Sequence, residues 1–279
     1  MPELLTWEDA KIVGEILSAR LPHVADVAPA NLYLFRREHE YQLHRGSLPY
    51  LTGRAYDGAR LIMPLFAHAD ANPTQWIELL GQDGWLFPLR QEELSTLPPD
   101  WQMHCNPDDS DYVYQTRQLA SLFGTRDRRR QAARFLGSGR ITGLSFDDPA
   151  APALALEVLE GWQAQSGKDP AATDLTNSRE AIERVAALKL FGEVILRDDA
   201  PVGFILASTP WSDMTVIHFA KGLAEANGVY PAMFSRIAAR PDAPIWTSFE
   251  QDLGNPRFRQ AKRAYGPDHL LAKYRARPT

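Results

Sequence analysis

The chain has 279 residues, of which 44% are hydrophobic and 23% are charged, and its formal net charge is −5. This composition is that of an ordinary globular protein, and the negative charge argues against a general nucleic-acid coat or a binder of anionic membranes. Cys105 is the only cysteine, which excludes an intramolecular disulfide and a multi-cysteine zinc site and fits a reducing cytoplasm.

The length allows one large domain or two of ordinary size, because a single core stops growing near ~250 to 300 residues, and we expect two. The N-terminus has no basic region followed by an apolar stretch, and no segment approaches about 18 apolar residues in a row. We therefore expect no signal peptide, no membrane span and a cytoplasmic location.

The first half of the chain predicts a helix, a hairpin, a second helix and a strand. Thr6 is a suitable N-cap for a helix over residues 6–19, with Asp9 as its capping-box partner. The turn at Tyr56–Ala59 separates two β-prone runs and predicts a hairpin. Residues 73–80 are helix-like and 84–89 strand-like, and we expect irregular structure around a short strand in residues 95–115.

Residues 117–136 form a helix-like run that contains a cluster of arginines: Arg126, Arg128, Arg129, Arg130 and Arg134. The cluster fits either an exposed linker helix or a phosphate contact, since guanidinium forks match phosphate oxygens. The next segment, "GSGRITGLSFDDPAAP", has the composition of a linker. We therefore predict an N-terminal domain over residues 1–145 and a C-terminal domain over residues 146–279.

The second half predicts helices over residues 152–165 and 178–190, the latter capped by Ser178. A hairpin around Asp-Asp-Ala-Pro follows, then a third strand at 214–222 and a helix at 228–239. With a strand and a helix after these, the order indicates an α+β fold with a mainly antiparallel sheet. No internal sequence repeat is visible.

The stretch from Ile245 to Gly266 places two carboxylates before a basic helix. In an extended chain Glu250 and Asp252 would share one face. Asn255 suits the N-cap of the helix that follows, and the helix is expected to run about ten residues, to Gly266. One side of it is cationic and the other apolar (Arg259, Lys262 and Arg263 against Phe258, Ala261 and Tyr265). The pattern fits an active-site elbow or an ordinary solvated helix.

Several segments resemble the DUF2156 group, which is related to the C-terminal domain of phosphatidylglycerol lysyltransferases and has a GNAT acyltransferase fold. They are "DSDYVYQTRQLASLFG", "VGFILAST", "IHFAKGLAEANGVY" and above all "FEQDLGNPRFRQAKRAYGPDHLLAKY". The pattern of the last motif falls on Glu250, Asp252, Leu253, Gly254, Arg259, Lys262, Tyr265, Pro267, Lys273 and Tyr274. The resemblance covers nearly the whole chain and implies two GNAT-like domains in tandem, each a mixed, mainly antiparallel sheet flanked by helices. It places the active site in the second domain or between the two.

Acyl transfer from an activated ester needs a base near the attacking group and a cation or N–H near the developing oxyanion. The resemblance therefore implies Asp252 or Glu250 as the base, or as the holder of a cationic amino group, and Lys262 or Arg259 at the oxyanion. Lys221 fits a substrate contact or a solvated strand end. Tyr265 fits core packing, an acid or a substrate wall, and His218 fits a buried core histidine or a catalytic one.

The acyl donor is expected as a co-substrate, with no tightly bound cofactor. Acetyl-CoA enzymes of this fold hold pyrophosphate on a glycine-rich loop. At that place the chain has "KGLAEANGVYPAMF", where Gly228 and Tyr230 fit a phosphate contact or a simple turn. The lysyltransferase relatives use aminoacyl-tRNA, and Arg128, Arg129 and Arg130 suit a tRNA phosphate backbone. We therefore expect an aminoacyl-tRNA donor ahead of acyl-CoA.

The acceptor is expected to be an amine or hydroxyl of a soluble small molecule or peptide. Two other functions stay open: an acyl-CoA-dependent N-acyltransferase and a non-catalytic GNAT-like binding module. The second is motivated by Ser248 and Phe249, which stand where the family has Asn-Arg. No metal is expected, because the seven histidines lack the spacings of ligands.

Overall fold

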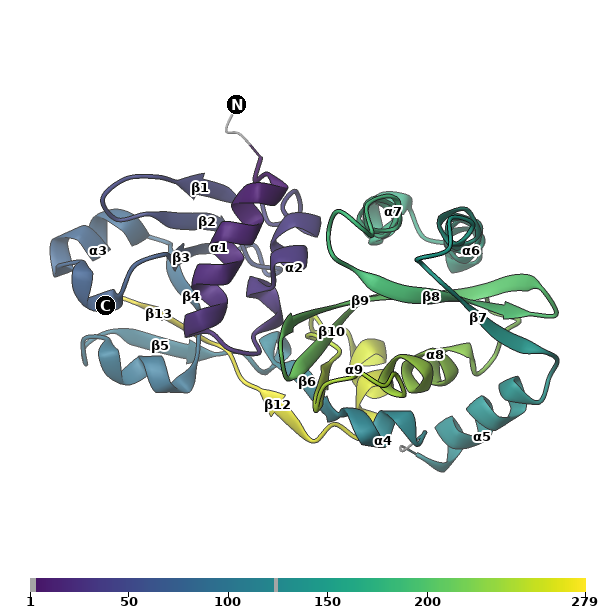
Figure 1. The fold of residues 1–279 in the computed structure, drawn as a ribbon. Coiled ribbons are helices and arrows are strands. Elements are labelled where there is room, and N and C mark those ends of the chain that lie inside the picture. The colour runs from purple at the N-terminus through teal and green to yellow at the C-terminus, as the bar shows by residue number, and fades with distance from the viewer. Residues whose placement is uncertain (1–3, 123–124) are drawn as a thin grey trace. The chain divides into compact units, whose positions relative to one another are not determined.

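The computed structural model describes residues 4–122 and 125–279, and these residues form two compact units (Figure 1). The first unit ends at Asp111 and also includes Gln251–Asn255 and Leu270–Thr279. The second comprises Tyr112–Glu250 and Pro256–His269. The predicted domain division at residue 145 differs from these units, which group residues 112–145 with the second sheet. Phe123 and Gly124, which belong to one of the resembling segments, lie outside the described residues.

The first unit contains a six-stranded sheet in the order β1-β2-β3-β4-β13-β5. The predicted helix, hairpin, helix and strand are all confirmed, and Thr6 and Asp9 form the predicted capping box. Strands β2 and β3 are antiparallel, whereas β3 and β4 are parallel and are joined through α3. The elements are α1 (Trp7–Arg20), η1 (Ala25–Val27), α2 (Pro29–Leu34), β1 (Gln42–His44), β2 (Tyr50–Arg54), β3 (Arg60–Pro64), η2 (His68–Asp70), α3 (Pro73–Leu80), β4 (Trp85–Leu89), η3 (Gln91–Thr96), β5 (Gln102–Cys105), η4 (Pro107–Asp109) and β13 (Tyr274–Arg277).

The second unit contains a seven-stranded sheet in the order β12-β6-β11-β10-β9-β8-β7. The predicted hairpin is β8–β9, and the predicted third strand is β10, which is antiparallel to β9 and parallel to β11. The elements are β6 (Asp111–Gln115), α4 (Thr116–Ala120), α5 (Arg126–Leu136), β7 (Ile141–Ser145), α6 (Ala151–Ser166), η5 (Pro170–Ala172), α7 (Leu175–Glu183), β8 (Phe191–Arg197), β9 (Ala200–Trp211), β10 (Met214–Gly222), α8 (Val229–Ala238), β11 (Trp246–Ser248), α9 (Pro256–Arg263) and β12 (His269–Leu271).

Helices cover both faces of the second sheet: α6 and α7 lie over one face and α8 over the other (Figure 1). The core on the α8 side is rich in aromatic rings, with Tyr114, Phe249 and Tyr265 buried against Val229 and Met233 of α8. Burying such side chains removes a large apolar area from water, at roughly 25 cal/mol per Å². This packing holds β10, β11 and α8 in one rigid block around the candidate site.

The two units repeat one order of elements, although their sequences show no repeat. Each runs through two helices, three antiparallel strands, a helix and a strand parallel to the third (α1 to β4 and α6 to β11). Each sheet also takes a strand from a distant part of the chain: β13 lies beside β4, and β6 lies beside β11. The predicted fold class, α+β with two GNAT-like domains in tandem, is confirmed.

Three local predictions are wrong. Residues 117–136 form two helices, α4 and α5, rather than one. Residues 141–145 are strand β7 rather than linker, because an edge strand pairs on one side only and needs few apolar residues. Ser178 is not an N-cap: Asp174 holds that position, and Ser178 is buried inside α7.

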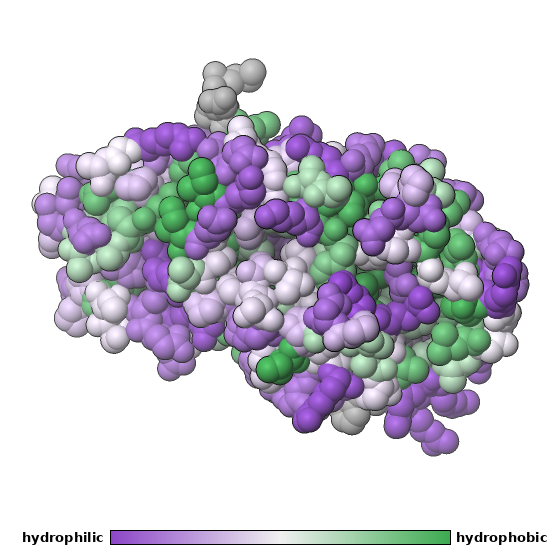
Figure 2. All heavy atoms as spheres, in the orientation of Figure 1, coloured by the Kyte–Doolittle hydropathy of each residue, from purple (hydrophilic) through white to green (hydrophobic). Residues whose placement is uncertain are grey.

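No helix in the described ranges is long and apolar enough to cross a membrane. Hydrophilic residues are spread over the face of the molecule seen in Figure 2, with hydrophobic ones between them.

Candidate active site

The second sheet opens where its parallel strands part. Residues 214–216 of β10 pair with residues 246–248 of β11, but β10 continues to Gly222 while β11 ends at Ser248. Ligands of α/β sheets bind outside the carboxyl ends of parallel strands, where the chain leaves the sheet. His218 and Glu250 stand two residues beyond the last paired residues, at the start of this opening.

His218 is the extra residue of a β-bulge in β10. Ile217 lies opposite Ala207 and Phe219 lies opposite Leu206, so no residue of β9 is the partner of His218. A bulge redirects a side chain and is common beside active sites. The imidazole is fully buried and is hydrogen-bonded through both ring nitrogens: Nδ1 lies 3.2 Å from Glu250 Oε1, and Nε2 lies 2.8 Å from Ser208 Oγ.

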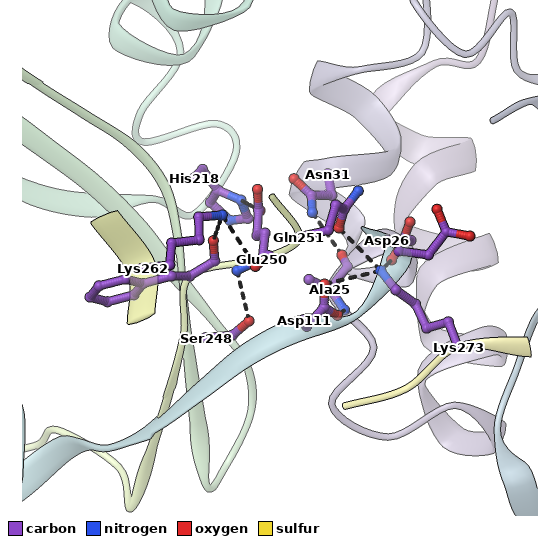
Figure 3. A network of polar contacts seen from close by, with 12 residues as sticks. Ala25, Asp26, Asn31, Asp111, His218, Ser248, Glu250, Gln251, Lys262 and Lys273 are labelled. Atoms are coloured by element: carbon purple, nitrogen blue, oxygen red, sulfur yellow. Dashed lines mark hydrogen bonds and ion pairs between the residues drawn. The ribbon is translucent and has the colours of Figure 1, made fainter. Parts of the chain in front are cut away.

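Glu250 faces His218 because the chain bends sharply after β11 (Figure 3). Its φ is +57°, in the left-handed region that residues other than glycine seldom occupy. The bend is held by the Ser248 hydroxyl, which accepts the Glu250 N–H at 3.1 Å, and by Tyr112, whose N–H donates to the Glu250 carbonyl at 3.1 Å. The prediction of one extended face for Glu250 and Asp252 is therefore wrong. Strain of this kind is often found at functional sites.

Lys262 supports the same bend from α9. Its ammonium donates to the carbonyls of Phe249 and Glu250, and its own carbonyl accepts the Tyr114 hydroxyl at 2.8 Å. Helix α9 has eight residues, shorter than predicted, and Gly266 follows it with φ +69°. Lys262 thus brings a positive charge to the Glu250 bend and binds its backbone there, and its predicted role at the oxyanion stays a prediction.

A cavity of about 260 Å³ lies at the N-terminus of α8. Its lining includes the predicted residues Arg128, Gly228 and Tyr230. Gly228 has φ +100°, and a Cβ at this position would lie 2.2 Å from the carbonyl oxygen of Gln131 in α5. Only glycine fits here. Because Gly228 has no side chain, α5 can approach closely and place Arg128 next to the first turn of α8.

Arg128 and Tyr265 contact each other at this cavity wall. The guanidinium lies 5.2 Å from the centre of the Tyr265 ring, and its Nη1 donates to Gln131 at 3.2 Å. Burial raises the pKa of Tyr265, although Arg128 opposes the shift. Tyr265 therefore keeps its proton at neutral pH. Its ring packs in the core and contacts the Arg128 guanidinium.

Lys221, at the end of β10, is buried rather than solvated. Its ammonium binds both carboxylate oxygens of Asp174 at 2.6 and 2.7 Å and lies 4.1 Å from the centre of the Trp162 ring. The next residue, Gly222, donates its N–H to the Tyr230 hydroxyl at 3.2 Å. Lys221 thus ties the start of α7 to the strand end beside the cavity.

The other predicted residues lie elsewhere. Asp252 is buried in the first unit, where its Oδ1 accepts the Gly254 N–H at 3.0 Å. Arg129 and Arg130 are exposed on α5, and Arg259 is half-buried on α9. Their roles in catalysis and in phosphate binding stay predictions. Among the described residues no group of three His, Cys, Asp or Glu side chains is placed to hold a metal.

Ser208 and Asp174 were missed by the sequence reasoning. Ser208 stands in the apolar run "VGFILAST", and a lone hydroxyl in a buried strand is a weak signal that a polar partner lies on the next strand. In the sheet Ser208 lies opposite Val216, two residues before His218, and the bulge that brings the imidazole to this hydroxyl could not be seen in the sequence.

A second buried polar cluster lies in the first unit, around Lys273 (Figure 3). The fully buried ammonium contacts Asp26, Asp111 at 3.0 Å and Gln251 at 3.1 Å. Burial raises the pKa of Asp111 to about 6, although Lys273 opposes the shift. Burial alone lowers the pKa of Lys273, but Asp111 and Asp26 outweigh it, so the pKa of Lys273 rises above its usual value.

Comparisons with known proteins agree with this architecture. Residues 19–277 match the family model described as phosphatidylglycerol lysyltransferase, C-terminal. A conserved protein of unknown function from Bacteroides thetaiotaomicron is similar with a TM-score of 0.81 and 19% identity, over 99% of both chains. L-PGS from Bacillus licheniformis is similar with a TM-score of 0.65 and 11% identity, over 99% of this chain and 93% of that one. The comparison with curated proteins found no match.

The fold and the family together indicate a GNAT-like acyltransferase. The chain belongs to the phosphatidylglycerol lysyltransferase C-terminal (DUF2156) family, whose model covers nearly its whole length.

Proposed function

We propose that the protein moves an aminoacyl group from aminoacyl-tRNA to an amine or hydroxyl of a soluble small molecule or peptide. The observation that supports catalysis most directly is the buried pair of His218 and Glu250 at the opening of the parallel strands. Imidazole is the side chain most often used for proton transfer, and a carboxylate on Nδ1 sets its tautomer and orientation.

The direction of the hydrogen bonds supports a base role for His218. An ionised carboxylate only accepts, so Nδ1 carries the proton that it donates to Glu250, and Nε2 of the neutral ring is left as an acceptor. Nε2 is then the atom that can take a proton from an attacking group. Glu250 also stabilises the imidazolium that forms, in place of the direct base role predicted for it.

The cavity at α8 suits the phosphate end of the donor. The dipole of α8 favours an anion at this end of the helix, and Arg128 adds a guanidinium at the same wall. Gly222 is four residues beyond His218 on β10, a rise of about 13 Å, which would separate a phosphate site from the reacting carbonyl. The exposed Arg129 and Arg130 extend this positive surface along α5.

The same cavity favours one other function, an acyl-CoA-dependent N-acyltransferase, because the pyrophosphate of CoA is an equally suitable anion. We place aminoacyl-tRNA first for two reasons. The family description refers to lysyl transfer, and the loop before α8 has one glycine, Gly228, at the helix start. The exposed arginines of α5 also fit a long phosphate backbone better than a single cofactor.

The test is retention of labelled aminoacyl-tRNA on a filter at fixed salt, with unlabelled CoA as competitor. We expect retention above that of uncharged tRNA that CoA does not reverse, and at least ~10-fold weaker retention for Arg128→Ala, since a charge-assisted phosphate contact contributes about 1.5 to 3 kcal/mol. Arg54→Ala, an exposed arginine on β2 of the first sheet, is the control. Direct binding of CoA with weak tRNA retention would favour the acyl-CoA enzyme. Binding of neither would favour a non-catalytic module.

A further inference from the structure

We propose that Ser208 is a nucleophile that receives the acyl group as a covalent ester before the acceptor takes it. The inference rests on the proposed function and adds a reaction step to it. Ser208, His218 and Glu250 form a continuous chain of hydrogen bonds, called the Ser208 relay below. Serine, histidine and a carboxylate in this order are the groups that activate a serine hydroxyl in unrelated hydrolases.

The protonation states of the relay follow from its contacts. In the tautomer with the ring proton on Nδ1, that nitrogen donates to Glu250, Nε2 accepts, and the Ser208 hydroxyl is the donor at 2.8 Å. A hydroxyl that donates to a ring nitrogen is poised to lose its proton to that nitrogen. The His218 side chain has no exposed surface, and Ser208 is buried as well, with 7% of its surface exposed, so an acyl group would reach Nε2 only by way of the Ser208 hydroxyl.

Three segments of the chain build the relay independently. Ser208 lies on β9, opposite Val216, and His218 is the bulged residue of β10. Glu250 stands on the strained bend after β11, which Ser248, Tyr112 and Lys262 hold in place. A bulge and a left-handed glutamate are both unfavourable locally. Both are needed to place Nδ1 on the carboxylate and Nε2 on the hydroxyl.

The reaction balances without a co-reactant beyond the donor and acceptor. Ser208 Oγ attacks the acyl carbonyl carbon while its proton moves to His218 Nε2. The bond from that carbon to the donor oxygen or sulfur breaks, and Nε2 returns the proton to the leaving group. The acceptor then attacks the seryl ester, gives its proton to Nε2, and Ser208 Oγ leaves and regains that proton. Water in place of the acceptor would give hydrolysis.

A fluorophosphonate tests the nucleophile without the natural donor. The serine oxygen forms a bond to phosphorus and fluoride leaves, and the adduct is found by mass spectrometry of the Ser208 peptide. We expect labelling of the wild type, none of Ser208→Ala, and at least ~100-fold slower labelling of His218→Gln, because base assistance is removed. Ser235→Ala is the matched control, since its hydroxyl donates to the Ala120 carbonyl at 2.7 Å on α8.

A second measurement tests the nucleophile if a variant does not fold or if the fluorophosphonate cannot reach Ser208. Wild-type protein mixed with p-nitrophenyl acetate should release a burst of nitrophenol close to one equivalent, followed by a slower steady rate. Wild type with neither label nor burst, or label that is equally fast in His218→Gln, overturns the inference. Transfer from aminoacyl-tRNA without any serine adduct would leave the proposed function standing, with direct attack by the acceptor.

Discussion

The Lys273 cluster of the first unit and the Ser208 relay of the second are both buried and both hydrogen-bonded, but they hold charge in different ways. Lys273 is a fixed cation between Asp26 and Asp111, and its raised pKa means that it does not release a proton near neutral pH. The relay instead centres on an imidazole with a carboxylate at one ring nitrogen and a hydroxyl at the other. In the relay the imidazole contacts a hydroxyl that it can deprotonate, whereas the carboxylates of the Lys273 cluster contact a cation.

The difference teaches that a buried carboxylate and lysine are weak evidence for catalysis. The C-terminal motif contains Lys262, Lys273, Glu250 and Asp252 at similar prominence. In the structure Lys273 and Asp252 belong to the first unit, and Glu250 reaches the imidazole of the second. Stability and activity should therefore separate when each cluster is changed in turn.

The largest expected effect is on transfer by His218→Gln. Loss of the base should lower the rate by about 10²- to 10⁴-fold. The free energy of unfolding should fall by only about 1 to 3 kcal/mol, the cost of leaving Ser208 and Glu250 without their partner. Steady-state transfer and urea unfolding measure the two. His269→Gln, an exposed histidine on β12, is the control. A decrease in the transfer rate of less than ten-fold would contradict a catalytic role for the relay.

Lys273→Met should cost about 3 to 5 kcal/mol of stability, because Asp26 and Asp111 would be left buried without their cation. The loss should be smaller at pH 4 than at pH 7, since Asp111 is protonated at pH 4 and then needs no counter-charge. Urea unfolding at both pH values measures it, with Lys11→Met on the surface of α1 as control. Unchanged stability together with lost transfer would assign Lys273 to catalysis instead.

Asp111→Asn should change how stability depends on pH. In the folded state Asp111 has a pKa of about 6, whereas the ordinary pKa of an aspartate is 3.8. Between these values the folded state binds more protons than the unfolded state, so this contribution to stability is present at low pH and is lost as the pH rises through about 6. The variant should lack that decline in urea titrations from pH 4 to 7. Asp199→Asn is the control. If the free energy of unfolding changed with pH in the same way in both variants, the decline would not come from Asp111.

The smallest expected effect is that of Arg140→Ala. Arg140 pairs with Asp199, but the two side chains are 65% and 74% exposed. Water and salt screen such a pair, so the free energy of unfolding should change by no more than about 1 kcal/mol. If Arg140→Ala lowered the free energy of unfolding as much as Lys273→Met does, the loss would come from breaking an ion pair and not from burial of the charges.

The sequence predicts elements well where the signal is local. The Thr6–Asp9 capping box, the turn at Gly58 and the hairpin at Asp198 and Asp199 each depend on a few adjacent residues. Asp198 and Asp199 both adopt positive φ, which the twist of a two-residue hairpin requires and which Asp tolerates. The linker reading of residues 141–145 fails because an edge strand is recognised by its partner, β8, and not by its own composition.

By itself the sequence determined the order of helices and strands, the family resemblance, and the residue types available near the C-terminus. Only the tertiary structure decided which of those residues meet. Insertion of β13 and β6 into distant sheets, the bulge at His218 and the left-handed bend at Glu250 depend on pairing and packing between segments far apart in the chain. Such contacts are set by burial of the whole core, and no local pattern records them.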